Sequence, residues 1–221
     1  MVDFVLFPGG LDAEALKTWL GDRKIEASLL SAVGGSPDWL EGFFSEDIYF
    51  LNLDQQTPVP FINRYETPET LGRDRIAAVA GVQATFPGQP ALVIDAGTCI
   101  TFDAVSEEGV YLGGIISPGL EMRFKSLQAF THGLPLIERA ENHELEGGST
   151  EAAIRSGVMN GMMEEISGLV GRYQKKYPGL VVAGTGGDYE ILVKALKNTI
   201  FADPYLVLQG LNVILNYNRK Q

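Results

Sequence analysis

Apolar and polar positions along the chain repeat with two different periods, which predicts alternating strands and helices. Short apolar runs bounded by turn residues predict strands at 2–7, 25–33, 48–53, 61–65, 91–95, 100–105, 110–116, 134–137, 180–183 and 199–202. Longer amphipathic stretches predict helices at 12–20, 75–85, 120–130 and 150–173, one between the last two strands, and one from about residue 205. Strands and helices in this order are typical of a layered α/β protein.

Several of these elements carry their own start and stop signals. Asp12 is placed to cap the first helix, which Gly21 ends, and Ser36-Pro37 starts a short helix. The run Ser106-Glu107-Glu108-Gly109 between two apolar segments predicts a β-hairpin. The apolar stripe of the 150–173 helix is expected to pack in the core and not to form a binding surface; it comprises Met159, Met162, Met163 and Leu169.

Composition excludes several classes of function. The formal net charge of -11 argues against a nucleic-acid partner and against an anionic membrane surface, because both need basic residues. Backbone amides and a metal can still hold ATP on an acidic protein. Cys99 is the one cysteine, so no intramolecular disulfide can form, and no signal peptide is recognisable. With two histidines and no long apolar run, neither structural zinc nor a membrane span is expected, and we expect a cytoplasmic protein.

Two glycine-containing segments follow predicted strands and suggest phosphate binding. Asp95-Ala96-Gly97-Thr98 ends one strand; its aspartate can hold a cation, its glycine admits a phosphate, and its threonine hydroxyl can donate to it. Gly184-Thr185-Gly186-Gly187-Asp188 joins a later strand to a helix, whose N-terminus favours an anion. Both segments can also be read as ordinary turns, with Asp188 as a helix cap.

Two further segments have a chemical and a structural interpretation. In Gly72-Arg73-Asp74-Arg75 the aspartate could take a proton from a substrate hydroxyl while an arginine grips a carboxylate, or the group could be a surface salt-bridge cluster. The glycine-rich passage from Gly113 to Arg123 could border a ligand or serve close packing.

Taken in order, these motifs resemble those of the type III pantothenate kinases. The resemblance rests on Tyr65 through Arg75, Asp95 to Thr98, Gly113 to Arg123, Ser149-Thr150 and Thr185-Gly186-Gly187. It implies an α/β protein with the duplicated, ribonuclease H-like fold of actin-like ATPases and sugar kinases. It also implies ATP-dependent phosphorylation of pantothenate, the first step towards coenzyme A.

The resemblance further implies roles for individual residues. Asp74 matches the general base, and Tyr65, Gly72, Arg73, Asp74, Arg75 and Thr150 match the pantothenate site. Gly97, Thr98, Thr185, Gly186 and Gly187 match ATP contacts, and Asp95 matches the ligand of a monovalent cation (K+ or NH4+). Mg2+ would accompany ATP. The family forms homodimers with the substrate site near the subunit interface.

One family motif is missing from the sequence. The family begins with a strand carrying D-x-G-N-T-x-x-K, whereas this chain starts with Met1-Val2-Asp3, and its Gly9-Gly10 pair lacks polar partners. We therefore expect an incomplete first lobe at residues 1–85, a second lobe at residues 86–221, and weak ATP turnover by this chain. An upstream start is the favoured explanation; loss of turnover in a non-catalytic binding or regulatory protein, or an unrecognised replacement, are the alternatives.

Overall fold

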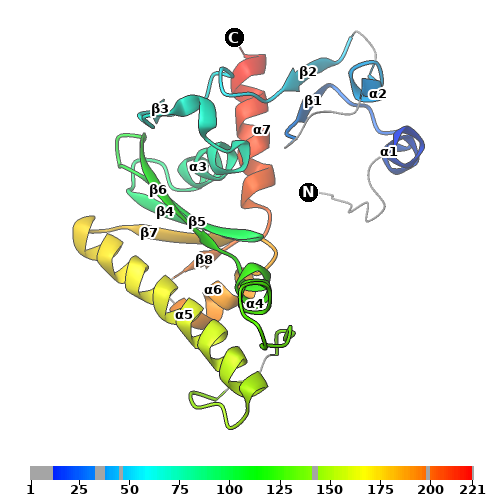
Figure 1. Ribbon diagram of the computed structural model, residues 1–221. Coiled ribbons are helices and arrows are strands. Elements are labelled where there is room, and N and C mark those ends of the chain that lie inside the picture. Colours follow the sequence, from blue (N-terminus) through cyan, green and yellow to red (C-terminus); the bar gives the residue numbers. More distant parts are fainter. Residues whose placement is uncertain (1–11, 33–37, 45–46, 141–143, 198–199, 221) are drawn as a thin grey trace.

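A six-stranded mixed sheet forms the centre of the computed structural model, which describes residues 12–32, 38–44, 47–140, 144–197 and 200–220 (Figure 1). The strand order is β3-β6-β5-β4-β7-β8. The strands are β3 (Ile62–Asn63), β4 (Ala91–Ala96), β5 (Cys99–Val105), β6 (Val110–Pro118), β7 (Val181–Thr185) and β8 (Phe201–Ala202). Strands β4, β5 and β6 form an antiparallel meander, while β7 runs parallel to β4, β8 to β7, and β3 to β6.

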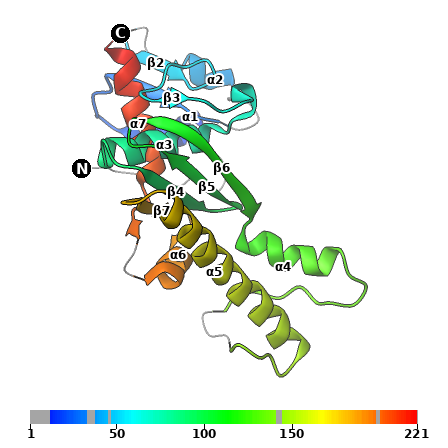
Figure 2. The same ribbon diagram turned by 90° about the vertical axis from the view of Figure 1, so that its left-hand side faces the viewer.

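Helices cover both faces of this sheet (Figure 2). Helices α3 (Arg73–Thr85) and α7 (Leu206–Arg219) share one buried cluster with the sheet, and α4 (Leu120–Ala129), α5 (Thr150–Lys176) and α6 (Tyr189–Leu196) share another. Along β4, Ala91 and Val93 face α3 and α7, while Leu92 and Ile94 face the other layer. A strand buried on both faces has to be apolar throughout, which explains why its sequence reads as a continuous apolar run.

Two glycines allow α3 and α7 to cross closely. A Cβ at Gly81 would lie 2.5 Å from the carbonyl oxygen of Leu206, and a Cβ at Gly210 would overlap with the carbonyl oxygen of Ala77. The helices therefore meet backbone to backbone. This contact fixes α3, whose first turn carries the Gly72–Arg75 segment, over the sheet.

The N-terminal part contributes a smaller unit beside α7 (Figure 1). Its elements are α1 (Ala13–Leu20), β1 (Ala27–Leu30), α2 (Asp38–Glu41), β2 (Tyr49–Asn52) and the 3-10 helix η1 (Pro68–Thr70). Strands β1 and β2 pair in parallel, and Glu26 forms an ion pair with Arg219 of α7 at 3.0 Å. Strand β3 belongs to the six-stranded sheet and α3 packs on that sheet, although both lie before residue 86. Elements from both predicted lobes therefore contribute to the sheet and its covering helices. The boundary between the lobes after residue 85 stays a prediction.

Most predicted elements are confirmed within two to three residues of their ends. Asp12 caps α1 by accepting a hydrogen bond from the Ala15 amide, and β5 and β6 form the predicted hairpin. The strand predicted at 134–137 is wrong: this stretch is irregular, and its apolar pattern reflects Ile137 packing into the core. The strand predicted at 2–7 and the Ser36-Pro37 helix start lie outside the described residues.

The described part of the chain contains no helix with both the length and the apolar composition needed to cross a bilayer. Of the four stripe positions on α5, Met159 and Met162 are buried, and Met163 and Leu169 pack partly buried against the same cluster. The predicted core role of this stripe is confirmed.

Candidate active site

The two predicted phosphate-binding segments meet at one edge of the sheet. Strands β4 and β7 are paired neighbours, and Asp95 lies directly beside Thr185 in the register. The Asp188 amide donates to the carbonyl oxygen of Ala96 at 2.9 Å. Because parallel strands end at the same edge, residues 95–98 and 185–188 form one continuous loop surface.

Glycine is required where these loops touch. Gly186 has a φ of +96°, and a Cβ there would overlap with the Ala96 carbonyl oxygen and the Asp95 carboxylate. Gly119 closes the surface from the third side, because its amide donates to the Thr98 carbonyl oxygen at 3.1 Å. The structure thus brings together the predicted ATP contacts Gly97, Thr98, Thr185, Gly186 and Gly187. Thr98 and Gly187 are exposed there, while the Thr185 side chain is buried.

The ionised form of the Asp95 carboxyl is disfavoured in this position. Burial, and then the negative charges of Asp74 and Asp103, raise the pKa of its carboxyl to about 6. No hydrogen bond to this carboxylate is formed within the described ranges, so nothing there offsets its charge. A cation bound at Asp95 would remove this penalty, because an opposite charge favours the ionised carboxylate.

The described residues around Asp95 offer oxygen donors and no clustered side-chain ligands for a metal. The described residues contain no group of three or more histidine, cysteine, aspartate or glutamate side chains able to share a metal ion. One carboxylate beside backbone carbonyls supplies oxygen donors of modest total charge. Mg2+ commonly relies on one or two carboxylates plus substrate phosphates, and this arrangement is compatible with that mode.

The Gly72–Arg75 segment starts α3 on the same side of the sheet as Asp95. Asp74 is exposed in the first helical turn, and its charge reaches Asp95. No side chain caps this helix at Gly72. Arg73 instead donates a hydrogen bond to the carbonyl oxygen of Ala32, just after β1.

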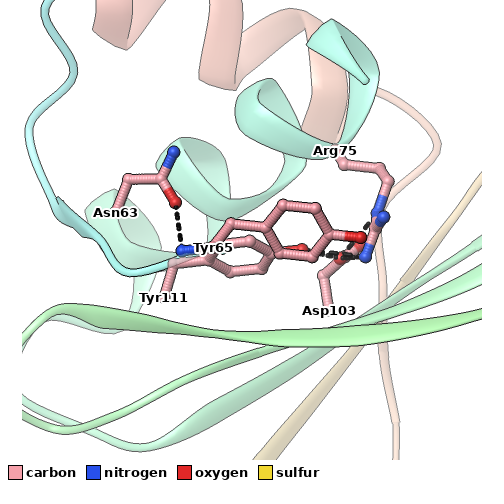
Figure 3. A network of polar contacts seen from close by, with 5 residues as sticks. All are labelled: Asn63, Tyr65, Arg75, Asp103 and Tyr111. Carbon is pink, nitrogen blue, oxygen red and sulfur yellow. Dashed lines mark hydrogen bonds and ion pairs between the residues drawn. The ribbon is translucent and has the colours of Figure 1, made fainter. Parts of the chain in front are cut away.

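Arg75 does not lie on the surface but reaches down to the sheet (Figure 3). Its Nε donates to Oδ1 of Asp103 at 2.8 Å, and its Nη2 lies 2.6 Å from the same oxygen and donates to the Tyr111 hydroxyl at 2.8 Å. The Tyr111 hydroxyl donates to this oxygen too, at 2.7 Å. Burial alone lowers the pKa of the Arg75 guanidinium, but the hydrogen bond and charge of Asp103 outweigh burial and raise it.

Tyr65 covers this buried group. The Arg75 guanidinium lies 5.5 Å from the centre of the Tyr65 ring, and the rings of Tyr65 and Tyr111 are 5.8 Å apart (Figure 3). The Tyr65 amide donates to the side-chain oxygen of Asn63 at 2.9 Å. A cation held against an aromatic face in this way stabilises both groups. The half-buried Tyr65 therefore has a fixed position beside the start of α3.

The glycine pair in β6 makes room for the network. A Cβ at Gly114 would lie 2.8 Å from Asp103 Oδ1 and 2.9 Å from Arg75 Nη2, and it would overlap with the Phe102 carbonyl oxygen. At Gly113, which has a φ of +93°, a Cβ would lie 3.9 Å from the Tyr65 ring. The passage from Gly113 to Arg123 had two interpretations, a ligand border and close packing. At Gly114 the structure shows close packing.

Thr150 lies apart from the other predicted pantothenate-site residues. It is exposed in the first turn of α5, and both views show that turn at the end of the molecule away from α3 (Figures 1 and 2). A cavity of about 650 Å³ beside it is lined by residues of α4 and α5, among them Arg123, Leu127 and Val158. Within one chain, Thr150 does not join Tyr65 and Asp74.

Sequence reasoning assigned no role to Asp103 or Tyr111. A signal for Asp103 was present, since an acidic residue inside the apolar run Ile100–Val105 has to be paired if its side chain faces the core. Its partner Arg75 is 28 residues away, and no local pattern identifies it.

The fold and this site define an α/β protein in which two glycine-containing loops meet at the carboxyl ends of the paired strands β4 and β7. The sequence profile described as "Type III pantothenate kinase" matches residues 32–172. A type III pantothenate kinase of Christiangramia forsetii is 49% identical over 197 residues, which cover 89% of this chain and 81% of the relative. One of Bacteroides fragilis is 54% identical over 166 residues, 75% of this chain and 68% of the relative.

A solved structure agrees with these sequence matches. A conserved protein of Campylobacter jejuni, assigned to the Baf family of transcriptional activators, superimposes with a TM-score of 0.54 at 26% identity. The match covers 78% of this chain and 74% of that one. The chain belongs to the type III pantothenate kinase family.

Proposed function

We propose that this chain catalyses ATP-dependent phosphorylation of pantothenate to phosphopantothenate, the first step of coenzyme A biosynthesis. Membership of the family supports this proposal. The observation that carries it in the structure is that the carboxylate of Asp74 is exposed beside the edge where the glycine loops of β4 and β7 meet. With pantothenate and ATP as its substrates, we propose that the enzyme is cytoplasmic.

Asp74 is the proposed general base. The pantothenate hydroxyl oxygen attacks the γ-phosphorus of ATP, the bond from that phosphorus to the β,γ-bridging oxygen breaks, and ADP leaves. The hydroxyl proton passes to the Asp74 carboxylate. Phosphoryl transfer of this kind needs positioning and charge stabilisation more than covalent help. An exposed carboxylate on a fixed helical turn meets the first need.

The loops of β4 and β7 are the proposed nucleotide side of the site. Gly97, Gly186 and Gly187 expose backbone to the phosphates, and Thr98 offers a hydroxyl donor. A monovalent cation, K+ or NH4+, is proposed at Asp95, where it would supply positive charge near the phosphates. Mg2+ would enter with ATP. Asp95 has no hydrogen-bond or ion-pair partner among the described residues, and its raised pKa supports a cation at this point.

We also propose a homodimer in which Thr150 completes the partner's pantothenate site. The separation of Thr150 from Tyr65 and Asp74 within one chain supports this arrangement (Figures 1 and 2). Large apolar side chains are exposed at the same end of the molecule, with Phe130 at 88% and Leu145 at 76% exposure. Exposed apolar groups of this size commonly mark a protein interface.

A coupled assay for ADP formation tests the activity. We would measure pantothenate-dependent turnover with K+ and Mg2+, in this chain and in a form preceded by a D-x-G-N-T-x-x-K segment. Asp74→Asn should abolish turnover, while Glu164→Gln, an exposed carboxylate on α5, should not change it. If neither form turns over pantothenate, the kinase proposal fails. Pantothenate or ATP binding without turnover would then favour the alternative, a non-catalytic binding protein.

Complementation tests the shared site. Asp74→Asn and Thr150→Val should each be inactive as pure proteins. Once the two variants exchange subunits, half of the dimers are mixed, and each mixed dimer holds one intact site, so about a quarter of full activity should return. No recovery, although co-purification of a tagged with an untagged subunit shows that mixed dimers form, would mean that each site uses Thr150 of its own chain or does not use it.

A further inference from the structure

Asp103 is a buried acidic residue that has no role in the reaction proposed above. It lies in the middle of β5, fully buried, between Val93 of β4 and Gly114 of β6. Its Oδ1 receives hydrogen bonds from Arg75 and Tyr111, whereas its buried Oδ2 has no partner in the part of the chain that is described. A buried carboxylate is costly unless it is paired and hydrogen-bonded, and breaking such a pair is strongly destabilising.

We propose that Arg75 and Asp103 form an anchor that positions the general base Asp74 and the Tyr65 ring. This inference rests on the function proposed above and assigns Asp103 as a positioning residue. Arg75 follows Asp74 directly in the first turn of α3, so a guanidinium fixed to the sheet also fixes the backbone that carries Asp74.

The start of α3 needs such an anchor. Gly72 supplies no capping side chain, and an uncapped first turn has four amides without helical partners, so it frays readily. The side chains of Arg73 and Arg75 do not cap these amides, but as hydrogen-bond donors they tie the turn to its surroundings from opposite sides. Arg73 is tied to the Ala32 carbonyl oxygen beyond β1, and Arg75 to Asp103 in the sheet. Asp74 lies between them.

The geometry leaves Arg75 little freedom. Its Nε and Nη2 both bind Oδ1 of Asp103, Nη2 also binds Tyr111, and Tyr65 covers its π face (Figure 3). Arg75 is only 5% exposed. In a surface salt-bridge cluster, the interpretation left open from the sequence, this side chain would be solvated. The burial instead supports a structural link from the sheet to the candidate site.

Hydrogen exchange tests the anchor without reference to any substrate. Asp103→Asn keeps the side-chain shape and removes the charge, and it should accelerate exchange of the Ile76 amide, which donates to Gly72, by about tenfold or more. Ile166→Ala in α5 is the matched control, because it removes a fully buried side chain from the other cluster, on the opposite face of the sheet. It should loosen α5 and leave the first turn of α3 unchanged. Equal effects of both variants on Ile76 would overturn the anchor.

Kinetics then tests the link to catalysis, in the form that turns over. Asp103→Asn should lower kcat by about 10- to 100-fold, as expected for a displaced base, with KM for ATP within about twofold. Because the substitution acts through the position of Asp74, kcat should fall while the affinity for the nucleotide stays unchanged. A kcat within about twofold of the wild type, or a loss that lies wholly in KM for ATP, would overturn the positioning role and leave the kinase proposal standing.

A milder variant covers the case that Asp103→Asn does not fold. Tyr111→Phe removes one hydrogen bond to Oδ1 and keeps the ion pair. It should show the same pattern, faster exchange at Ile76 and a lower kcat, at a smaller amplitude. If the wild-type chain turns over no pantothenate while exchange at Ile76 responds as expected, the proposed function fails and the anchor remains as a structural device.

Discussion

Replacing Asp95 by asparagine should stabilise the protein. In the folded chain, burial and the charges of Asp74 and Asp103 raise the pKa of Asp95 from 3.8 to about 6. The folded state therefore binds a proton more tightly than the unfolded state does. A group of this kind costs stability as pH rises from about 4 to about 6, and the full penalty is present above that range.

The size of the penalty follows from the shift. A displacement of about two pH units corresponds to about 3 kcal/mol at pH 8, and the same linkage relation gives about 1.5 kcal/mol at pH 5. Asn has nearly the shape of Asp and carries no charge. Asp95→Asn should therefore raise the free energy of unfolding by up to about 3 kcal/mol at pH 8 and by about half of that at pH 5.

Urea denaturation at equal protein concentration, at pH 5 and pH 8, measures both values. Tetramethylammonium should replace small cations in the buffer. K+ added at pH 8 should then stabilise the wild-type chain and not Asp95→Asn, because a ligand of the folded state raises its stability by mass action. Glu164→Gln, which neutralises an exposed carboxylate on α5, is the control and should change neither value. A destabilised Asp95→Asn, or a gain that is equal at both pH values, would refute the reasoning.

Three further substitutions test the packing around the site. Gly186→Ala should cost about 2–4 kcal/mol in urea denaturation and abolish nucleotide binding in calorimetry, because a Cβ meets backbone at a φ of +96°. Gly210→Ala should cost about 3 kcal/mol or more despite the better helix propensity of alanine, since it forces α3 and α7 apart. Arg139→Gln should cost less than about 1 kcal/mol, because the Arg139 side of its 2.7 Å ion pair with Asp188 is largely exposed.

Each of these three has an internal control. Gly187→Ala, at an exposed position where a Cβ meets no atom within 4 Å, should be tolerated where Gly186→Ala is not. Gly171→Ala on α5 has equally open surroundings and should be neutral or stabilising. Raising the salt concentration should reduce the effect of Arg139→Gln and leave the two glycine effects unchanged. A salt-sensitive effect of Gly210→Ala would contradict the steric account.

The sequence predicts this fold well wherever local signals coincide with packing. The β5–β6 hairpin combines two apolar runs with a turn, and α1 has an N-cap and a glycine stop, so both were found. The stretch 134–137 has the same apolar signal but is irregular; Ile137 is buried in the core and Leu134 packs partly buried against it. An apolar run in the sequence indicates that the segment is buried. It does not indicate whether the segment pairs as a strand, because strand pairing depends on residues far away in the sequence.

The same distinction between local signals and long-range contacts applies to the candidate site. Asp95 and the Thr185–Gly187 loop were recognisable because each short segment follows a strand, and the parallel pairing of β4 and β7 was enough to bring them together. A sequence shows the charge of Arg75 and not the direction of its side chain, and its assignment to the pantothenate site stays a prediction. Its burial depends on Asp103, on the register that sets Asp103 opposite Gly114, and on the missing Cβ that makes room for the guanidinium. A buried ion pair of this kind depends on three chain segments at once, and any one of them taken alone resembles ordinary strand or helix. The same reasoning applies to the start of α3 as a whole. The carboxylate of Asp74, the proposed base, is visible in the sequence, whereas the contacts of Arg73 with the Ala32 carbonyl oxygen and of Arg75 with Asp103 depend on chain segments far away in the sequence.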